Sequence, residues 1–337
     1  MALREELLES VAAVERHLPA WDALAVARGR PYCAPGWMLS WLHEVAPAGA
    51  ALRACVVRDG DELVGIAPFW TLRDGGEGRY GVLAERTAYP IEPLSVEGRD
   101  EEVAAAVARL LAAAVPCPQA IDLTGVPAAS RWPHLLAESW PDSSGASIAR
   151  TREEPVPSVS LRHPSMDAWL GTRSRNFRQQ LRRGRRRLDE AGASFRLSTA
   201  SELDRDISSL ARLHHARWTS RGGSAALDAR VEAMLRLAAR ELGPERFRLM
   251  SIDVEDTCIS AHLFVRAGGT RAYWLGGFDE GWSDCRPSIQ VLAAAIEDGI
   301  ECRDDRLELG PGGQHYKYRL SDGEDRVAWL TLTPAAR

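Results

Sequence analysis

The chain has 337 residues, of which 45% are hydrophobic and 26% are charged, so it is long enough for two globular domains, and its composition excludes a fibrous or disordered protein. The formal net charge of −5 gives no overall attraction to nucleic acid or to a membrane surface, so contact with either needs a local basic patch. No apolar run approaches the roughly 20 residues of a transmembrane helix, and the acidic start of the chain is unlike a signal peptide, so we expect a cytoplasmic protein.

The first half of the chain predicts a β-hairpin. Two apolar runs, 51–57 and 63–72, flank Asp59-Gly60-Asp61, which is a typical hairpin turn sequence. A helix over about 100–115 and a strand over Ala120–Leu123 follow.

The stretch 141–157 is rich in proline, serine and acids, which indicates a connection or an edge strand. We therefore predict one domain over 1–157, a degenerate copy, and a second, catalytic domain over 158–337.

The second half repeats the plan of the first. Helices are predicted over Asp167–Glu190, Ser201–Ser220, Ala225–Leu242 and Pro287–Gly299. Strands are predicted over Phe247–Ile252, Ile259–Val265, Arg271–Gly276, Arg306–Leu309 and Val327–Leu332. The recurring order of elements indicates a tandem duplication. The predicted class is α/β (α+β), with a twisted, mostly antiparallel sheet flanked by helices in each half.

The helix that begins at Pro287 is a candidate anion site. Its first-turn N–H groups, on Ser288, Ile289 and Gln290, have no partners within the helix, and Arg286 directly before it adds a positive charge. An ordinary helix start with a solvated arginine is the competing interpretation.

A second candidate site surrounds a glycine-rich turn after the strand that ends near residue 309. Glu308 or His315 could accept a proton from an attacking amine, and Lys317 could bind phosphate or stabilise an oxyanion, with Tyr316 beside it. Lys317 is the single lysine among 42 basic residues, which favours a local role although chance retention would also explain it. A Glu308–Lys317 salt bridge that only fixes the last strand is the alternative.

His262 is a further candidate base. Strand alternation puts it on one face with Ser260, while apolar residues occupy the other face. A lone histidine on a strand is more often structural. No cysteine or serine has a recognisable nucleophile setting, and the six cysteines lack a C-x-x-C pair, so we predict neither a covalent intermediate nor a metal site.

The segment Arg173–Arg187 holds eight arginines in 15 residues and predicts a basic amphipathic helix. Arg175, Arg178 and Arg182, with Trp218, are candidates for binding the phosphates of a carrier, which could be coenzyme A or transfer RNA. A solvated arginine face is the competing interpretation.

Five segments, in one order, resemble the CelD/BcsL group of GNAT-superfamily acetyltransferases, which is related in fold to the Fem aminoacyl transferases. They are SRNFRQQLRRGRRRL, LHHARW, YWLGGFDEGW, RPSIQVLAAAIEDGI and LELGPGGQHYKYRL. The resemblance implies two GNAT folds, a coenzyme A pyrophosphate at the helix beginning at Pro287, and transfer at splayed central strands of the second half. It matches Tyr316-Lys317 to the family's terminal Tyr-Lys pair, whereas Ser288 stands where the family commonly has glycine.

The resemblance implies an enzyme that moves an acyl group from acyl-CoA to an amine, hydroxylamine or hydroxyl of a small molecule or glycan, in polysaccharide or specialised-metabolite biosynthesis. The alternative is aminoacyl transfer from a charged transfer RNA, which the arginine helix would bind. A third possibility is a catalytically silent binding or scaffold protein for a polysaccharide machine.

Overall fold

The computed structural model describes residues 3–72, 78–141, 146–219, 222–224 and 226–334. The chain forms two compact units, the first made of Met1–Pro155 with Asp325–Arg337 and the second of Val156–Glu324. The predicted division assigned the whole of 158–337 to one domain. In the structure the final strand instead belongs to the first unit, because it pairs with the strand over Ala120–Pro127. The roles assigned to the two domains stay predictions.

The first unit is a mixed sheet with helices. Its strands are β1 (Arg4–Leu8), β2 (Ala50–Asp59), β3 (Glu62–Leu72), β4 (Arg79–Val82), β5 (Leu94–Ser95), β6 (Ala120–Pro127) and most of β13 (Gly323–Thr333). Its helices are α1 (Val11–Val14), α2 (Leu18–Ala27), α3 (Pro35–Glu44), α4 (Asp100–Ala112) and α5 (Trp132–Glu138). The strand order is β1-β2-β3-β4-β6-β13, in which β4 and β6 are parallel and the other neighbours are antiparallel. The predicted hairpin is confirmed as β2 and β3.

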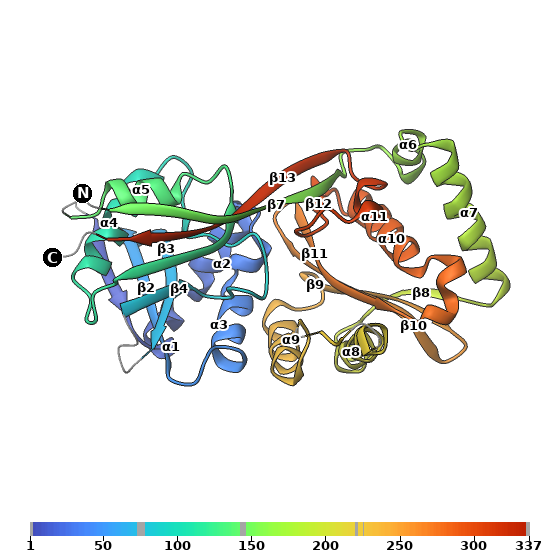
Figure 1. Cartoon of the computed structure of the whole chain (residues 1–337), viewed down its shortest axis with the longest axis horizontal. Helices are drawn as coiled ribbons and strands as arrows, with labels where there is room; N and C mark the ends of the chain where they lie inside the picture. The colour runs from blue at the N-terminus through green and yellow to red at the C-terminus, as the bar shows by residue number, and fades with distance from the viewer. Residues whose placement is uncertain (1–2, 73–77, 142–145, 220–221, 225, 335–337) are drawn as a thin grey trace. The chain divides into compact units, whose positions relative to one another are not determined.

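The second unit has the same kind of sheet. Its strands are the end of β7 (Ser147–Ser160), β8 (Ser194–Leu197), β9 (Phe247–Val254), β10 (Thr257–Ala267), β11 (Thr270–Phe278) and β12 (Arg306–Glu308). Its helices are α6 (Met166–Gly171), α7 (Arg175–Glu190), α8 (Leu203–Thr219), α9 (Ala229–Leu242), α10 (Pro287–Glu301) and α11 (His315–Tyr318), with a 3-10 turn, η5 (Glu280–Cys285), before α10. Helices α7 and α10 lie on one face of the sheet, and α8 and α9 lie on the other (Figure 1).

The two units match strand for strand. The second sheet has the order β8-β9-β10-β11-β12-β7, and its one parallel pair among the described residues, β11 with β12, corresponds to β4 with β6. In each unit a helix, α4 or α10, crosses between the two parallel strands. The predicted α/β class and the tandem plan are confirmed.

The prediction of one continuous helix over Asp167–Glu190 is wrong, because the segment forms two helices, α6 and α7. Ser174 has an extended backbone, and its hydroxyl accepts a hydrogen bond from the N–H of Phe177 at 3.2 Å, which starts a new helix. Helix α9 begins at Ala229 instead of Ala225, because the carboxylate of Asp228 caps it there. Residue 225 lies outside the described residues.

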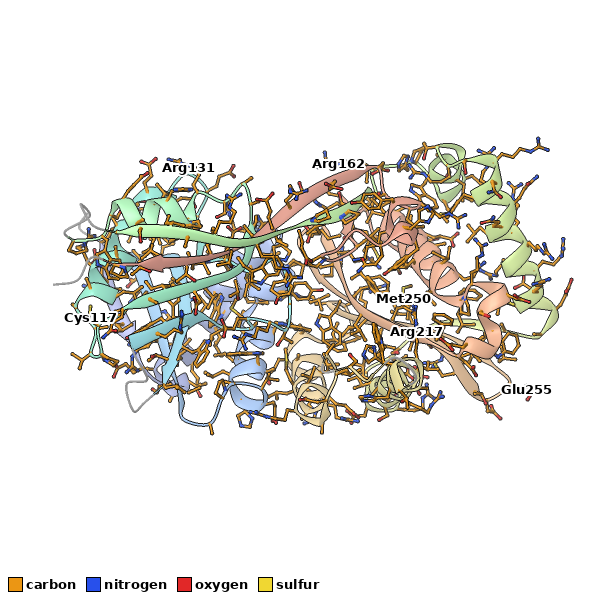
Figure 2. All side chains as sticks on the ribbon, in the orientation of Figure 1. Cys117, Arg131, Arg162, Arg217, Met250 and Glu255 are labelled. Atoms are coloured by element: carbon orange, nitrogen blue, oxygen red, sulfur yellow. The ribbon has the colours of Figure 1, made fainter. Side chains whose placement is uncertain are left out.

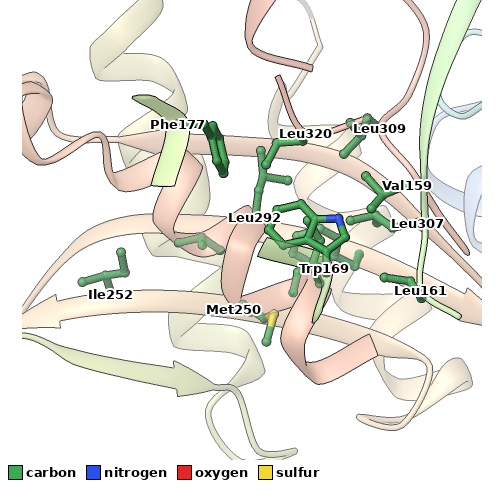
Figure 3. Close-up of a cluster of buried hydrophobic side chains, with 14 of the residues drawn as sticks. Val159, Leu161, Trp169, Phe177, Met250, Ile252, Leu292, Leu307, Leu309 and Leu320 are labelled. Atoms are coloured by element: carbon green, nitrogen blue, oxygen red, sulfur yellow. The ribbon is translucent and has the colours of Figure 1, made fainter. Parts of the chain in front are cut away.

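The core of the second unit fills the space between α7, α10 and the sheet. Trp169 lies within it and meets the edge of Phe177 at a centroid distance of 6.1 Å (Figure 3). Leu292 of α10 and Leu307 of β12 are also fully buried there. Burial of each such side chain stabilises the fold by about 1.5–3 kcal/mol, so this cluster positions both helices.

A buried ion network fixes α10 to the sheet near the helix C-terminus. Arg271 of β11 is fully buried and donates to Asp304 at 2.9 Å and to Asp298 of α10. Arg248 reaches Asp298 at 2.6 Å, and Arg266 reaches Asp304 at 2.6 Å. Burial alone would lower the pKa of Arg271, but the two carboxylates raise it. The guanidinium therefore stays charged, and α10 is held by charge as well as by apolar packing.

Within the described part of the chain, no helix is long and apolar enough to cross a bilayer. The same residues include no group of three or more His, Cys, Asp or Glu side chains arranged to hold a metal ion. The six cysteines are free thiols.

Candidate active site

The parallel strands β11 and β12 separate from one another after a short contact. They pair over Thr270–Ala272, and β11 continues to Phe278 while β12 ends at Glu308. Trp274 is an extra residue in β11 relative to β10, since Tyr273 and Leu275 face consecutive residues of that strand. Such a bulge bends a strand. Pairing between β11 and β12 ends at Ala272 and Glu308, and we call the place where the two strands part the central opening.

His262 of β10 lies next to Tyr273, the first residue of β11 beyond its pairing with β12. Its ring stacks on that of Tyr273 at a centroid distance of 5.5 Å, it is 1% exposed, and neither ring nitrogen has a hydrogen-bond partner. Glycine is needed opposite, because a Cβ at Gly276 would lie 2.2 Å from Nδ1. Burial, with a contribution from the charge of Arg217, lowers the pKa of His262 to about 3. The imidazole is therefore neutral at pH 7.

The other candidate bases have different surroundings. Glu308 is buried at the end of β12, and its Oε1 lies 3.5 Å from Arg306. Tyr316 shares a side-chain hydrogen bond with Tyr273, and burial raises the pKa of its phenol. His315 is exposed at the start of α11. The structure thus brings His262 and Tyr316 together at Tyr273.

Lys317 is tied to the loop that follows β12. Its ammonium donates hydrogen bonds to the carbonyl oxygens of Gly310 at 2.9 Å and Pro311 at 2.8 Å, and burial lowers its pKa to about 8. Gly310 bends the chain at φ +74°. These contacts position the loop, and they take the place of the anticipated bond between Lys317 and Glu308. A role of Lys317 in phosphate binding stays a prediction.

The start of α10 differs from the predicted anion site, in which the N–H groups of Ser288, Ile289 and Gln290 have no hydrogen-bond partners. The carbonyl of Arg286, the N-cap residue, accepts hydrogen bonds from Ile289 at 3.0 Å and from Gln290 at 3.2 Å. Of the three predicted N–H groups, those of Ile289 and Gln290 are therefore engaged. Within the described structure, only that of Ser288 makes no bond to the Arg286 carbonyl. The side chain of Gln290 is also engaged, since it donates to the carbonyl of Leu181 in α7 at 2.9 Å.

A basic pocket of about 460 Å³ lies between α7 and the start of α10. We call it the arginine pocket, and it is lined by Gln180, Arg183, Gly184, Arg187, Ser283, Asp284 and Arg286. Arg286 donates to Gln180 across it. Gly184 allows the close approach, because a Cβ there would lie 2.5 Å from the carbonyl of Cys285. Three guanidinium groups against one carboxylate suit an anionic ligand with phosphate oxygens.

The arginines predicted to bind a carrier do not gather in this pocket. Arg175 is exposed, Arg178 donates to the carbonyls of Arg173 and Gly171, and Arg182 lines a separate groove between α7 and α10 of about 660 Å³. Trp218 is 38% exposed on α8, on the opposite face of the sheet.

Sequence reasoning missed Arg183 and Arg187. The sequence signal was the spacing of Gln180, Arg183, Gly184 and Arg187, which puts all four on one helix face. The glycine on that face indicates close packing against another element.

Arg217 of α8 is a further residue that the sequence did not single out. Its guanidinium carbon lies 4.7 Å from the ring centre of Phe278, at the end of β11. Figure 2 labels Arg217. His214, one turn earlier, bonds Ser224 at 2.9 Å, and burial together with the charges of His215 and Arg217 lowers the pKa of His214 to about 4. A cation thus lies among neutral aromatic groups beside the central opening.

Residues 175–318, all within the second unit, match the family model described as Acetyltransferase (GNAT) domain. No curated protein matches the sequence significantly. Among solved structures, FemX is similar with 12% identity, 98% of this chain and 97% of that chain covered, and a TM-score of 0.67.

Two further structures share the fold over nearly the whole chain. A tandem GNAT protein from the clavulanic acid biosynthesis pathway has 15% identity, 99% and 100% coverage and a TM-score of 0.53. L-PGS from Bacillus licheniformis has 13% identity, 96% and 92% coverage and a TM-score of 0.58. At these identities the likeness concerns the fold. The chain therefore has the two-unit α/β fold of these proteins, and residues 175–318 of its second unit match the GNAT acetyltransferase domain model.

Proposed function

We propose that the second unit transfers an acyl group from acyl-CoA to an amine, hydroxylamine or hydroxyl acceptor by direct attack. The observation that carries the proposal is the arginine pocket at the start of α10, the helix that follows the open part of β11. Arg183, Arg187 and Arg286 would hold the diphosphate of the donor by charge-assisted hydrogen bonds. Bound acyl-CoA would supply the activated carbonyl.

The side chains at the central opening would handle the proton of the acceptor. Glu308 is a buried carboxylate at the point where β12 leaves β11, and a carboxylate can take a proton from an attacking amine directly or through water. His262 is neutral and has free ring nitrogens, so it can accept a hydrogen bond from the acceptor. His315, which is exposed, is the third candidate base.

Direct attack is supported by the state of the thiols in this unit. Burial raises the pKa of Cys285, and it raises the pKa of Cys258 to about 12. Both are therefore thiols at neutral pH and poor nucleophiles.

The acceptor class follows from resemblance. The CelD/BcsL-like segments and the similar fold of a protein from the clavulanic acid pathway support a role in polysaccharide or specialised-metabolite biosynthesis, in the cytoplasm. These finer assignments remain part of the proposal.

A second candidate function is transfer from an aminoacyl-tRNA. It is favoured by the exposed arginines of α7, among them Arg175, Arg182, Arg183 and Arg186, which could neutralise phosphates of an RNA backbone. The fold similarity to FemX is consistent with it.

Calorimetric titration with acetyl-CoA, longer acyl-CoAs and total transfer RNA, at low and moderate salt, separates the two functions. In the variant R183Q/R187Q/R286Q, loss of three charged partners is expected to weaken acyl-CoA binding about 100-fold. The matched control R175Q/R182Q removes arginines from the same helix outside the pocket, and it should bind acyl-CoA as the wild type does.

Binding of transfer RNA alone, falling steeply with salt and with R175Q/R182Q, would replace the acyl-CoA proposal with the second function. Absence of both kinds of binding would contradict both functions and leave the scaffold role.

A further inference from the structure

Arg217 carries a positive charge that no acid among the described residues neutralises. Its guanidinium forms no ion pair with any described carboxylate, and its buried Nε has no hydrogen-bond partner. The other arginines near the site differ: Arg173 reaches Asp322 at 3.4 Å, and Arg306 reaches Glu308. Arg217 is half-buried, so water screens its charge only in part.

The groups around Arg217 are neutral at pH 7. Burial lowers the pKa of His262 and of His214, and it raises the pKa of the Tyr316 phenol. The charge of Arg217 acts on all three, which means that its guanidinium lies within electrostatic reach of both sides of the central opening. Phe278 supplies an aromatic face for the cation. None of these groups is an anion.

Arg217 is also apart from the arginine pocket. It lies on α8, which packs so closely on β11 that a Cβ at Gly277 would fall 2.7 Å from the backbone nitrogen of His214. The arginine pocket is built by α7 and the start of α10, on the opposite face of the sheet. The donor phosphates therefore have their own cations, and Arg217 is left for another anion.

A guanidinium in this setting suits a carboxylate. Its planar fork can make two parallel hydrogen bonds to one carboxylate group, and such bonds are stronger where water is partly excluded. A partly desolvated cation without an anion is unfavourable, so a ligand that brings the anion is bound preferentially.

We propose that Arg217 binds a carboxylate group of the acceptor, so that the acceptor of the second unit is an amine or alcohol that bears a carboxylate, as an amino acid does. This inference rests on the proposed function, because it assigns the acceptor of that same site.

Benzoate is the test probe, because it combines a carboxylate with a ring that suits the aromatic surroundings, and benzamide is its neutral match. Saturation-transfer NMR would measure the affinity of both for the wild type, R217Q and R217K. We expect benzoate to bind more tightly than benzamide, R217Q to weaken benzoate at least tenfold, and R217K to have an intermediate effect because it keeps the charge without the fork.

The matched control is R212Q, which removes an exposed arginine of the same helix that donates to the carbonyl of Cys258. It should bind benzoate as the wild type does. Thermal midpoints of all variants check that they fold.

Three results would overturn the inference: no binding of benzoate to the wild type, equal binding of benzoate and benzamide, or unchanged binding in R217Q. Displacement of benzoate by coenzyme A without an acyl group would show that the anion belongs to the donor, and the assignment to the acceptor would be wrong. Acyl-CoA affinity, measured on the same samples, reports separately on the proposed function, since its absence in the wild type contradicts that function whatever benzoate does.

Discussion

The crossing helices of the two units occupy equivalent places, and both have an arginine as N-cap, but their first turns differ in charge. The first turn of α4 carries Asp100, Glu101 and Glu102, and acids there are favourable because the helix N-terminus is partly positive. Helix α10 has no acid in its first turn and follows Arg286, with the arginine pocket beside it. The first unit thus has acids of its own at the positive end of its helix, whereas the second has none there.

The two units also differ in what lies beside their parallel strands, beyond the point where the pairing ends. In the first unit the chain itself lies against β6 beyond its contact with β4: Ile91 donates to the carbonyl of Gly125 at 3.1 Å, and the ring of Tyr89 occupies the place of a Cβ at Gly125. In the second unit the first residue of β11 beyond the paired segment is Tyr273, and the ring of His262 stacks on it. One topology therefore carries different side chains in the two units, and under the proposed function these side chains make the second unit the one that binds the donor.

The two helices are also held differently, and this contrast gives the largest expected effect. Helix α4 packs Val103 directly on Gly65, while α10 depends on the ion network around Arg271. Arg271→Met removes the one fully buried cation of the network and leaves Asp304 with Arg266 alone and Asp298 with Arg248 alone, which should destabilise the second unit by about 3–5 kcal/mol. Urea unfolding followed by fluorescence measures the loss.

The control for this change is R162Q, since Arg162 pairs with Asp305 on the surface. Its unfolding midpoint should equal that of the wild type. An equal midpoint for R271M would mean that apolar packing holds α10 without help from the ions.

Glu85 of the first unit and Lys317 of the second are both buried, and the stability of the two units should respond to their titration with opposite sign. Burial raises the pKa of Glu85 in the first unit to about 7 and lowers that of Lys317 in the second to about 8. Between pH 4.5 and 7 the folded state binds more protons than the unfolded state through Glu85, so stability falls as pH rises. Between pH 8 and 10.5 the unfolded state binds more protons through Lys317, so stability rises with pH.

The variants E85Q and K317M isolate these contributions. Relative to the wild type, E85Q should lack the fall and K317M should lack the rise, each by about 2–3 kcal/mol over its window. Unfolding midpoints measured from pH 4 to 11 check both. Parallel curves for a variant and the wild type would argue against a perturbed pKa at that residue.

The smallest expected effect tests the charge contrast at the helix starts. R286Q should weaken binding of acetyl-CoA about tenfold, because one charge-assisted contact of about 1.4 kcal/mol is lost. E101Q removes one charge, of the opposite sign, from the first turn of the corresponding helix α4, and it should leave acetyl-CoA affinity unchanged. Weaker binding in E101Q would show that the first unit also takes part in donor binding.

Much of the fold was predictable from local patterns. The hairpin of β2 and β3, the meander β9 to β11 and helix α10 follow from alternation, turn residues and a proline at the first helical position. The break at Ser174 was missed, because the helical spacing of apolar and basic residues continues on both sides of it. One serine is a weaker signal than that spacing. The placement of β13 in the first unit was missed because strand pairing over so long a separation leaves no local pattern.

The site was predictable in its elements but less so in its contacts. The helix start, Glu308, His262 and the loop after β12 were all named from sequence. The arginines of α7 could not be sorted into pocket and surface, since that depends on which helix face packs on η5. The partners of Lys317 were missed, because backbone carbonyls carry no residue-type signal.

The place of β13 has a consequence for the order in which the protein matures during synthesis. The first unit is translated first, yet β6 lacks its β13 neighbour until the ribosome has passed the whole second unit, a delay on the order of ten seconds or more. During that time β6 exposes a strand edge that could pair with another chain. The unit that is made first is therefore the last to be completed, and the nascent first unit is a natural client for chaperones.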